Sequence, residues 1–311
     1  MEMRQVLAQE FDCFIKSNKN IIVLNADLAK PNGLGELTKK YPDRVFNVGI
    51  AEQNMASVAS GMSSYGFIPF IVTFTPFATR RICDQIAISI CYAKQNVKII
   101  GTDPGITAEL NGGTHMSVED IGVLRSIPEI VIFEPTDNIQ LKKALPQIIN
   151  YHGPVYIRML RKTAFDIFSE NDEFDLFKAS VLKEGKDITI FCSGIMVKEA
   201  LTAAKILKEE SDISAEIINI HTIKPIDKKA IIKSVKKTKQ AIVAENHNII
   251  GGLYSAVCEV LSKEYPVPLK VIGIKDRFGQ VGKLSALQKE YQMRANDIIE
   301  AAKGIIKKNN F

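Results

Sequence analysis

Residues 46–80 carry the most informative pattern of the chain and read FNVGIAEQNMASVASGMSSYGFIPFIVTFTPFATR. Residues 45–48 form a short apolar segment, and the carboxylate of Glu52 follows it closely. Residues 53–65 are rich in Ala, Ser, Gly and Met, which favours a helix that packs closely. Residues 68–74 are apolar throughout, as is typical of a strand buried on both faces. This stretch therefore predicts a strand–helix–strand unit of an α/β sheet.

Charged and aromatic side chains lie at the ends of these two predicted strands. Phe74, Phe77 and Arg80 are spaced i, i+3, i+6, so a turn followed by a helix would present all three together. Each residue alone is commonplace, because a Glu after a strand often caps a helix and Phe residues often pack in a core. Together with Glu52 they predict a ligand pocket at the carboxyl ends of neighbouring strands, where α/β sheets bind ligands.

Composition narrows the class of protein. The 311 residues suit two domains, and 46% apolar content is enough for sizeable cores. The net charge of +5 is spread along the chain, so it gives no reason to predict a nucleic-acid partner. No apolar run is long enough to span a membrane, and the first residues show no secretory signal. Five cysteines without metal-ligand spacing predict reduced thiols, and therefore a cytoplasmic protein.

The hydrophobic pattern predicts two doubly wound α/β domains with mostly parallel sheets. The predicted boundaries are 1–165 for the first domain, 166–186 for an acidic linker without periodicity, and 187–311 for the second domain. In the first domain the pattern predicts helices over residues 2–18, 81–95, 117–127 (capped by Ser117) and 136–150 (capped by Thr136), and strands over 21–24, 97–101, 130–133 and 155–159. In the second it predicts strands over 188–192, 215–220, 241–245 and 269–274, and helices over 197–209, 227–234, 253–263 and the C-terminal segment.

Several motifs resemble one enzyme family in the same order along the chain. They are GIAEQN, TFTPFATR, DPGITAELNGGTH and SIPEIVIFEPTD in the first half, and HTIKPID, AENHNIIGGL and IKDRFGQVG in the second. The sequence is similar to the transketolase and deoxyxylulose-phosphate synthase group, enzymes that depend on thiamine diphosphate. The resemblance covers residues 2 to about 305. It implies a thiamine-diphosphate pyrimidine-binding fold followed by a fold like the transketolase C-terminal domain.

The resemblance assigns roles to the pocket residues. Glu52 matches the carboxylate that hydrogen-bonds the pyrimidine ring nitrogen and promotes proton removal from the cofactor. Phe77 would stack on the pyrimidine and Phe74 would line its pocket. Arg80 takes the place of a third pocket residue, in the form found in deoxyxylulose-phosphate synthases. His115 matches the histidine that hydrogen-bonds the sugar donor.

Four further residues match substrate-contacting positions of the family. Asp27 belongs to a segment beside cofactor and sugar, and Arg161 matches an arginine that grips the sugar phosphate. Asn111 stands where the family has Asp, and Asp103 or Pro104 stands where the family has a basic residue. The two replacements leave the donor open and suggest a modified one, such as a deoxy or otherwise specialised ketose.

The family's diphosphate site is missing from this sequence. Mg²⁺ and the diphosphate are held in the family by a Gly-Asp-Gly segment followed by Asn, and no GDG occurs in the 311 residues. The resemblance therefore implies an N-terminal-type partner subunit that carries this site, with the cofactor between the chains, in an α2β2 assembly. The predicted reaction is transfer of a two-carbon ketol unit from a ketose or ketose phosphate to an aldose.

Three alternatives remain open from the sequence. The beta subunit of a 2-oxo-acid dehydrogenase has the same domain order but differs around the loop that reads GGTH here. A deoxyxylulose-phosphate synthase activity is chemically close but is disfavoured by the split architecture. A catalytically silent regulatory partner would not need Glu52, Phe77 and His115.

Overall fold

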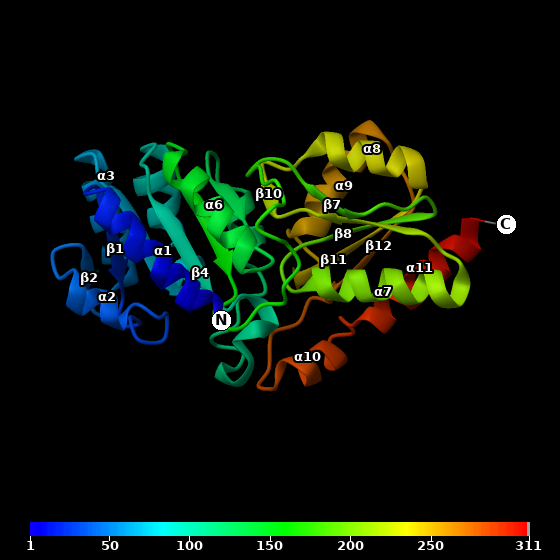
Figure 1. Cartoon of the computed structure of the whole chain (residues 1–311), viewed down its shortest axis with the longest axis horizontal. Helices are drawn as coiled ribbons and strands as arrows, with labels where there is room; N and C mark the ends of the chain where they lie inside the picture. Colours follow the sequence, from blue (N-terminus) through cyan, green and yellow to red (C-terminus); the bar gives the residue numbers. More distant parts are fainter. Residues whose placement is uncertain (310–311) are drawn as a thin grey trace.

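The computed structural model describes residues 1–309 and shows two α/β units side by side (Figure 1). The first unit is built on a seven-stranded sheet. Its strands in spatial order are β10 (Thr222–Lys224), β5 (Val131–Phe133), β6 (Val155–Met159), β4 (Lys98–Thr102), β3 (Ile68–Phe74), β1 (Ile21–Asn25) and β2 (Val45–Asn47). All neighbouring pairs are parallel except β10 with β5.

The second unit is built on a five-stranded sheet. Its strands in spatial order are β12 (Leu269–Ile274), β11 (Ala241–Asn248), β8 (Ile188–Cys192), β9 (Ala215–Asn219) and β7 (Ser180–Lys183). Only the edge strand β7 is antiparallel to its neighbour within the sheet. The prediction of two mostly parallel α/β sheets is therefore confirmed.

Helices cover both faces of each sheet. The first unit contains α1 (Met3–Ser17), α2 (Gly35–Lys40), α3 (Glu52–Ser64), α4 (Thr75–Ala78), α5 (Asp120–Arg125) and α6 (Asn138–Asn150), and the second contains α7 (Met196–Ser211), α8 (Lys228–Thr238), α9 (Leu253–Glu264), α10 (Leu284–Glu290) and α11 (Ala295–Asn309). Helices α1 and α6 pack their apolar sides on one face of the first sheet. Helices α7 and α11 do the same on the second sheet.

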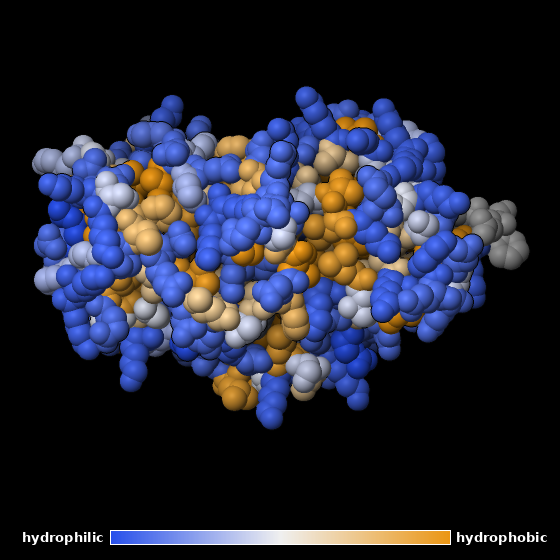
Figure 2. All heavy atoms as spheres, viewed as in Figure 1, coloured by the Kyte–Doolittle hydropathy of each residue, from blue (hydrophilic) through white to orange (hydrophobic). Residues whose placement is uncertain are grey.

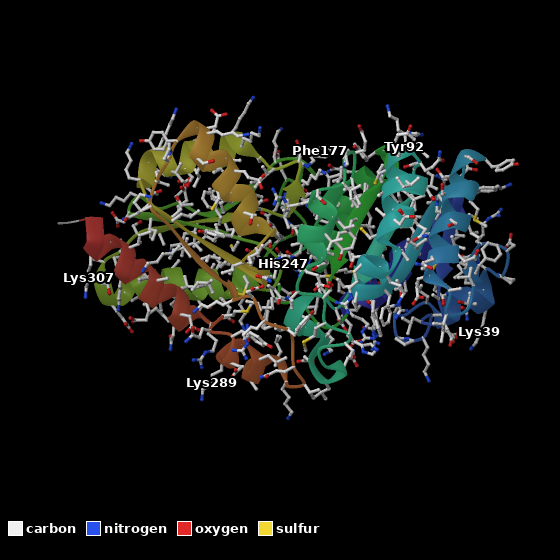
Figure 3. All side chains as sticks on the ribbon, turned by 180° about the vertical axis from the view of Figure 1, so that it is seen from behind. Lys39, Tyr92, Phe177, His247, Lys289 and Lys307 are labelled. Carbon is white, nitrogen blue, oxygen red and sulfur yellow. The ribbon has the colours of Figure 1, made fainter. Side chains whose placement is uncertain are left out.

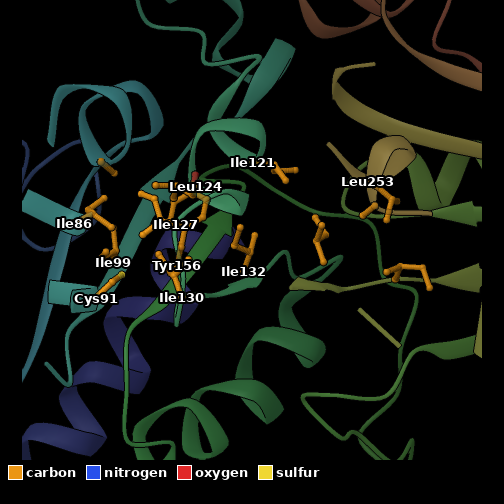
Figure 4. Packing of buried hydrophobic residues seen from close by; sticks show 14 of the residues in the cluster. Ile86, Cys91, Ile99, Ile121, Leu124, Ile127, Ile130, Ile132, Tyr156 and Leu253 are labelled. Carbon is orange, nitrogen blue, oxygen red and sulfur yellow. The ribbon is translucent and has the colours of Figure 1, made fainter. Parts of the chain in front are cut away.

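The largest apolar core joins the two units. It begins between α3 and the first sheet, continues through Ile121 and Leu124 of α5, and reaches Leu253 and Val257 of α9 without a break (Figure 4). Burial of apolar area is the main favourable term in folding, so a shared core favours a fixed arrangement of the two units.

A buried polar cluster lies in the same seam. The guanidinium of Arg158, which has no exposed surface, donates to both Asp120 oxygens at 2.7 and 3.2 Å, to Glu134 and to the backbone oxygen of Asn246 at 2.7 Å. His247 also lies between the units, and its Nε2 accepts from the Gly122 amide at 3.3 Å (Figure 3). Buried hydrogen-bonding groups of β6, α5 and β11 therefore pair with one another across the boundary between the two units.

One predicted helix has a different geometry. Residues 81–95 do not form a regular α-helix: Arg80–Ile82 form a 3₁₀ turn and Gln85–Tyr92 form a π-helix. Such irregular helices are frequent at functional sites. The break places Arg80 and Arg81 on a short turn directly after α4.

Two predicted caps are wrong. The cap of α6 is Asp137 rather than Thr136, and its carboxylate accepts from the Gln140 amide at 2.8 Å. Helix α5 begins at Asp120, three residues after Ser117. The carbonyls of Ser117 and Val118 accept instead from the amides of Gly105 and Asn248, so they are held outside the helix.

The linker prediction also needs correction. Ser180–Lys183 within the expected linker form β7, which pairs with β9 of the second sheet. Strand β10 departs from the predicted division as well, because it comes from the second half of the chain but pairs with β5 of the first sheet. One strand from the second half of the chain therefore joins the sheet of the first unit, and no local pattern predicts this pairing.

The face of the molecule seen in Figure 2 is polar over most of its area. Figure 2 shows hydrophilic side chains over much of one face, with apolar side chains gathered toward its middle. Among residues 1–309, no helix combines the length and the apolar character that crossing a bilayer requires.

Candidate active site

Glu52 lies at the first position of α3, just beyond the end of β2. It is only 4% exposed, because the small side chains of α3 pack closely against the first sheet. Its Oε1 accepts from the Arg81 guanidinium at 2.6 Å. The positive end of the helix dipole also favours a carboxylate at this position. The result is a buried carboxylate whose partner, Arg81, also lies against the Phe77 ring.

Phe74, Phe77 and His115 form an aromatic cluster. Phe74 is the last residue of β3, and Phe77 lies in α4. Their ring centroids are 6.1 Å apart, and the His115 ring lies edge-on at 6.2 Å from Phe74 and 5.4 Å from Phe77. Edge-to-face contacts of this kind are favoured between aromatic rings. The structure thus brings three of the predicted site residues together.

The loop that carries His115 is held by the second unit. A 3₁₀ helix spans Gly105–Asn111, and the Ile106 amide donates to the side chain of Asn246 at 3.0 Å. Asn246 in turn donates to the backbone oxygen of Pro104 at 2.9 Å. Gly105 has φ +55°, and a Cβ there would lie 2.3 Å from Asn246, so glycine is required by both conformation and space. The second unit therefore sets the position of this loop.

Glu109 adds a second anchor in a strained conformation. Its backbone has φ 49° and ψ −113°, which non-glycine residues rarely adopt. Its carboxylate pairs with Lys162 and accepts from the Leu284 amide at 2.8 Å. Strain of this kind persists where surrounding contacts hold it, and it is common at functional sites.

Arg161 connects the aromatic cluster to a basic cavity. Its guanidinium carbon lies 4.9 Å from the Phe74 ring centroid, and it pairs with Asp103 at 2.7 Å. Burial raises the pKa of Asp103, and Arg161 opposes that shift. Arg161, Arg4 and Lys30 line a cavity of about 610 Å³. The structure thus places three basic side chains from distant parts of the chain around one opening.

Other predicted site residues lie farther from the cluster or contact it differently. Asp27 is exposed and contacts Asn47, and Asn111 is exposed at the end of its 3₁₀ helix. The expectation that Arg80 joins Phe74 and Phe77 is not met by any contact with their rings. Arg80 instead pairs with Glu119 at 2.5 Å and donates to the Thr114 carbonyl at 3.4 Å.

Three residues near the site, Arg81, Arg4 and Lys30, were not predicted from the sequence. The guanidinium carbon of Arg81 lies 3.7 Å from the Phe77 ring centroid, so this residue takes the place beside the ring that was expected for Arg80. Spacing could not distinguish the two arginines, because i, i+3 and i, i+4 neighbours both meet on a helix. Arg4 and Lys30 carried no local signal, because only folding brings them close to Arg161.

The residues present fit a planar nitrogen-containing ring. The half-buried Phe77 ring and the buried Glu52 carboxylate already contact one planar donor, the Arg81 guanidinium, so a flat group with nitrogen atoms matches their chemistry. A metal site is a different matter. No cluster of three or more His, Cys, Asp or Glu side chains that could hold a metal occurs among residues 1–309.

Comparison with known proteins places these features in a family. Residues 1–165 match the family described as "Transketolase, pyrimidine binding domain", and residues 177–298 match "Transketolase, C-terminal domain". The chain is 48% identical over 298 residues to the 6-deoxy-6-sulfo-D-fructose transketolase subunit SqwH of Clostridium sp. (strain MSTE9), covering 96% of this chain and 92% of that protein.

Two further relatives agree with this match. The chain is 42% identical to a putative transketolase C-terminal section of Methanocaldococcus jannaschii, covering 91% of this chain and 89% of that protein. A solved structure described as a split gene transketolase, inactive beta4 tetramer, superimposes with a TM-score of 0.89 at 38% identity, covering 99% of this chain and 98% of the other. The chain therefore belongs to the transketolase family.

Proposed function

We propose that this chain is one subunit of a two-chain transketolase that depends on thiamine diphosphate. It would supply the pyrimidine half of the cofactor site and the sugar-contacting residues. The enzyme would transfer a two-carbon ketol unit from a ketose donor to an aldose acceptor in the cytoplasm. The observation that carries this proposal is the buried Glu52 carboxylate, which Arg81 links to Phe77 in the aromatic cluster with Phe74 and His115.

Glu52 would share a hydrogen bond with the pyrimidine ring nitrogen and exchange a proton with it. Its burial excludes water and strengthens this interaction. Phe77 would stack on the ring, and Phe74 would close the pocket. When bound, thiamine diphosphate supplies the carbon nucleophile that accepts and releases the two-carbon unit.

His115 would hydrogen-bond the oxygen atoms of the donor. Its Nδ1 lies 2.9 Å from the Thr114 hydroxyl, which orients the ring. Its other nitrogen is then available to a carbonyl or hydroxyl oxygen that gains charge during the reaction. The anchoring of the loop by Asn246 would keep the imidazole in position.

A partner subunit would hold the diphosphate and Mg²⁺. Two features support this division: the GDG segment is missing from the sequence, and residues 1–309 contain no acidic or histidine cluster suited to a metal. The similar split gene transketolase is described as inactive in its beta4 form, which supports a requirement for a second kind of chain. We propose an N-terminal-type subunit carrying GDG and Asn, in an α2β2 assembly.

The basic cavity suits a donor with an anionic end. Arg4, Lys30 and Arg161 contribute three positive charges, and Glu2 and Asp103 pair with two of them, which leaves a net charge of +1. Such a cavity attracts either a sulfonate or a phosphate monoester, so the choice between them rests on similarity to a relative. The SqwH relative is named for a sulfonated fructose. We propose a 6-sulfonated ketose as the preferred donor.

The subunit proposal is tested by calorimetric titration of thiamine diphosphate with Mg²⁺. The titration is done into this chain alone and into the chain mixed with its candidate partner. Binding by the mixture and not by the lone chain is the expected result. Tight binding by the lone chain would refute the divided site, and a lack of binding by both would refute the cofactor assignment.

The donor proposal is tested by comparing kcat/KM for ketoses that differ only at carbon 6. We expect the sulfonate to be used better than the phosphate, and the phosphate better than the neutral hydroxyl. An equal rate with all three would show that the basic cavity does not contact the donor.

A further inference from the structure

Arg81 makes two contacts that no role assigned above explains. Its guanidinium carbon lies 3.7 Å from the Phe77 ring centroid, close enough for the flat group to stack on the ring. The same guanidinium donates to Glu52 Oε1 at 2.6 Å. It therefore contacts the two groups that the proposed function reserves for the pyrimidine: the aromatic face and the carboxylate.

We propose that Arg81 acts as a placeholder in the pyrimidine pocket, which means that its side chain fills the place of the cofactor ring. It occupies the pocket of the unloaded chain and must swing out before the cofactor ring can enter. This inference rests on the proposed function, because it concerns the same pocket. It makes Arg81 a positioning residue that acts on Glu52 and competes with the cofactor.

Burial of Glu52 explains why a placeholder is needed. The Glu52 side chain is 4% exposed, whereas that of Arg81 is 41% exposed. A carboxylate that is buried without a partner is costly, so the unloaded pocket needs a counter-charge. A planar guanidinium meets this need and also covers the apolar face of Phe77.

The local backbone allows Arg81 to leave. It lies in the 3₁₀ turn Arg80–Ile82, between the short helix α4 and the π-helix Gln85–Tyr92. With two-fifths of its side chain already exposed, the guanidinium can move into solvent without crossing the core. Glu52, in contrast, is held by the first turn of α3 and stays in place.

Two opposite effects on the protein follow. Removing the Arg81 cation leaves Glu52 unpaired, so the unloaded chain becomes less stable. The same change frees the pocket, so the cofactor binds more tightly. The apparent affinity of a site that is mostly closed is reduced by the fraction that is open. From the usual strengths of stacked cations and ion pairs, we expect a gain in affinity of about threefold to thirtyfold.

The test uses the two-subunit complex and Arg81→Met, with Arg81→Gln as a second variant in case the first folds poorly. The measured quantity is the Kd of thiamine diphosphate with Mg²⁺. Arg277→Met is a matched control, because Arg277 also pairs with a carboxylate, Glu290 at 2.6 Å, and packs on a ring, Tyr291 at 4.7 Å. We expect a lower Kd in both Arg81 variants and an unchanged Kd in the control.

Weaker or unchanged binding in the Arg81 variants would overturn the placeholder role, because it would mean that Arg81 does not compete with the cofactor ring. A wild-type complex that fails to bind the cofactor would overturn the proposed function instead, so the two failures are distinguishable.

Thermal unfolding of the unloaded chain gives a second readout that requires no activity. We expect Arg81→Met to lower the midpoint temperature, and Arg81→Met combined with Glu52→Gln to recover most of the loss. Equal losses in the single and double variants would show that Arg81 does not serve Glu52.

Discussion

Replacing Arg158 by Met removes a guanidinium that joins the two units from within. Arg158 donates to Asp120 at 2.7 Å, to Glu134 and to the Asn246 carbonyl at 2.7 Å, and it has no exposed surface. Burial alone would raise the pKa of Asp120, but the charges of Arg158 and His247 hold it below its usual value. The variant would therefore leave two buried carboxylates without their shared cation.

The magnitude follows from the kind of group that is lost. Breaking a buried ion pair by removing one partner usually costs about 3–5 kcal/mol, because the remaining charge stays uncompensated. Two carboxylates and one carbonyl lose a donor here, so we expect a loss of unfolding free energy at the upper end of that range. Met replaces the aliphatic part of Arg158 but is shorter, so a small cavity would add to this loss.

Urea-induced unfolding followed by circular dichroism measures this loss. Arg294→Met serves as the control, because Arg294 pairs with Asp297 at 3.8 Å at the surface and its removal should leave stability unchanged. Adding Asp120→Asn and Glu134→Gln to Arg158→Met should recover most of the loss. A loss below about 1 kcal/mol, or a triple variant as unstable as the single one, would refute the reasoning.

Three further predictions concern single residues. Glu52→Gln should lower kcat by about a hundredfold or more without preventing complex formation, measured by steady-state kinetics and size-exclusion chromatography; turnover close to wild type would refute its role. Arg161→Lys keeps a cation beside Asp103 but loses the planar fork, so kcat/KM for an anionic donor should fall about tenfold while cofactor affinity stays unchanged; a change in cofactor affinity alone would contradict this. Burial raises the pKa of Glu245 from 4.5 to about 7, so the folded protein should lose about 3 kcal/mol of unfolding free energy as pH rises from 4.5 through 7. Urea unfolding across this range should show no such fall in Glu245→Gln, and parallel profiles for the two proteins would contradict the assignment.

Much of the fold and part of the site could be predicted from local patterns. The apolar run over residues 68–74 marks a strand because continuous burial on both faces requires it, and the structure has β3 at Ile68–Phe74. Phe74 and Phe77 could be paired because their spacing is local. His115 could be added only through its motif, since the ring contacts that join it to Phe77 span a large separation along the chain.

Other site residues could not be predicted because their role depends on small geometric differences. Arg80 and Arg81 are equivalent in a sequence of two adjacent arginines. The 3₁₀ turn decides that Arg81 stacks on Phe77 whereas Arg80 pairs with Glu119. The predicted regular helix beginning at residue 81 would not explain why Arg81, rather than Arg80, stacks on Phe77.

The alternation of strands and helices, the carboxylate and rings at the strand ends, and the resemblance to a family can all be recognised in the sequence, because each depends on residue types at short spacing. Which distant groups meet depends on how the whole chain folds. The tertiary structure places Arg4 and Lys30 beside Arg161, seats the His115 loop on Asn246, and pairs β10 with β5 across the two units. The physical reason is that these contacts arise from packing two sheets around one shared core, and no local pattern of residues encodes that packing.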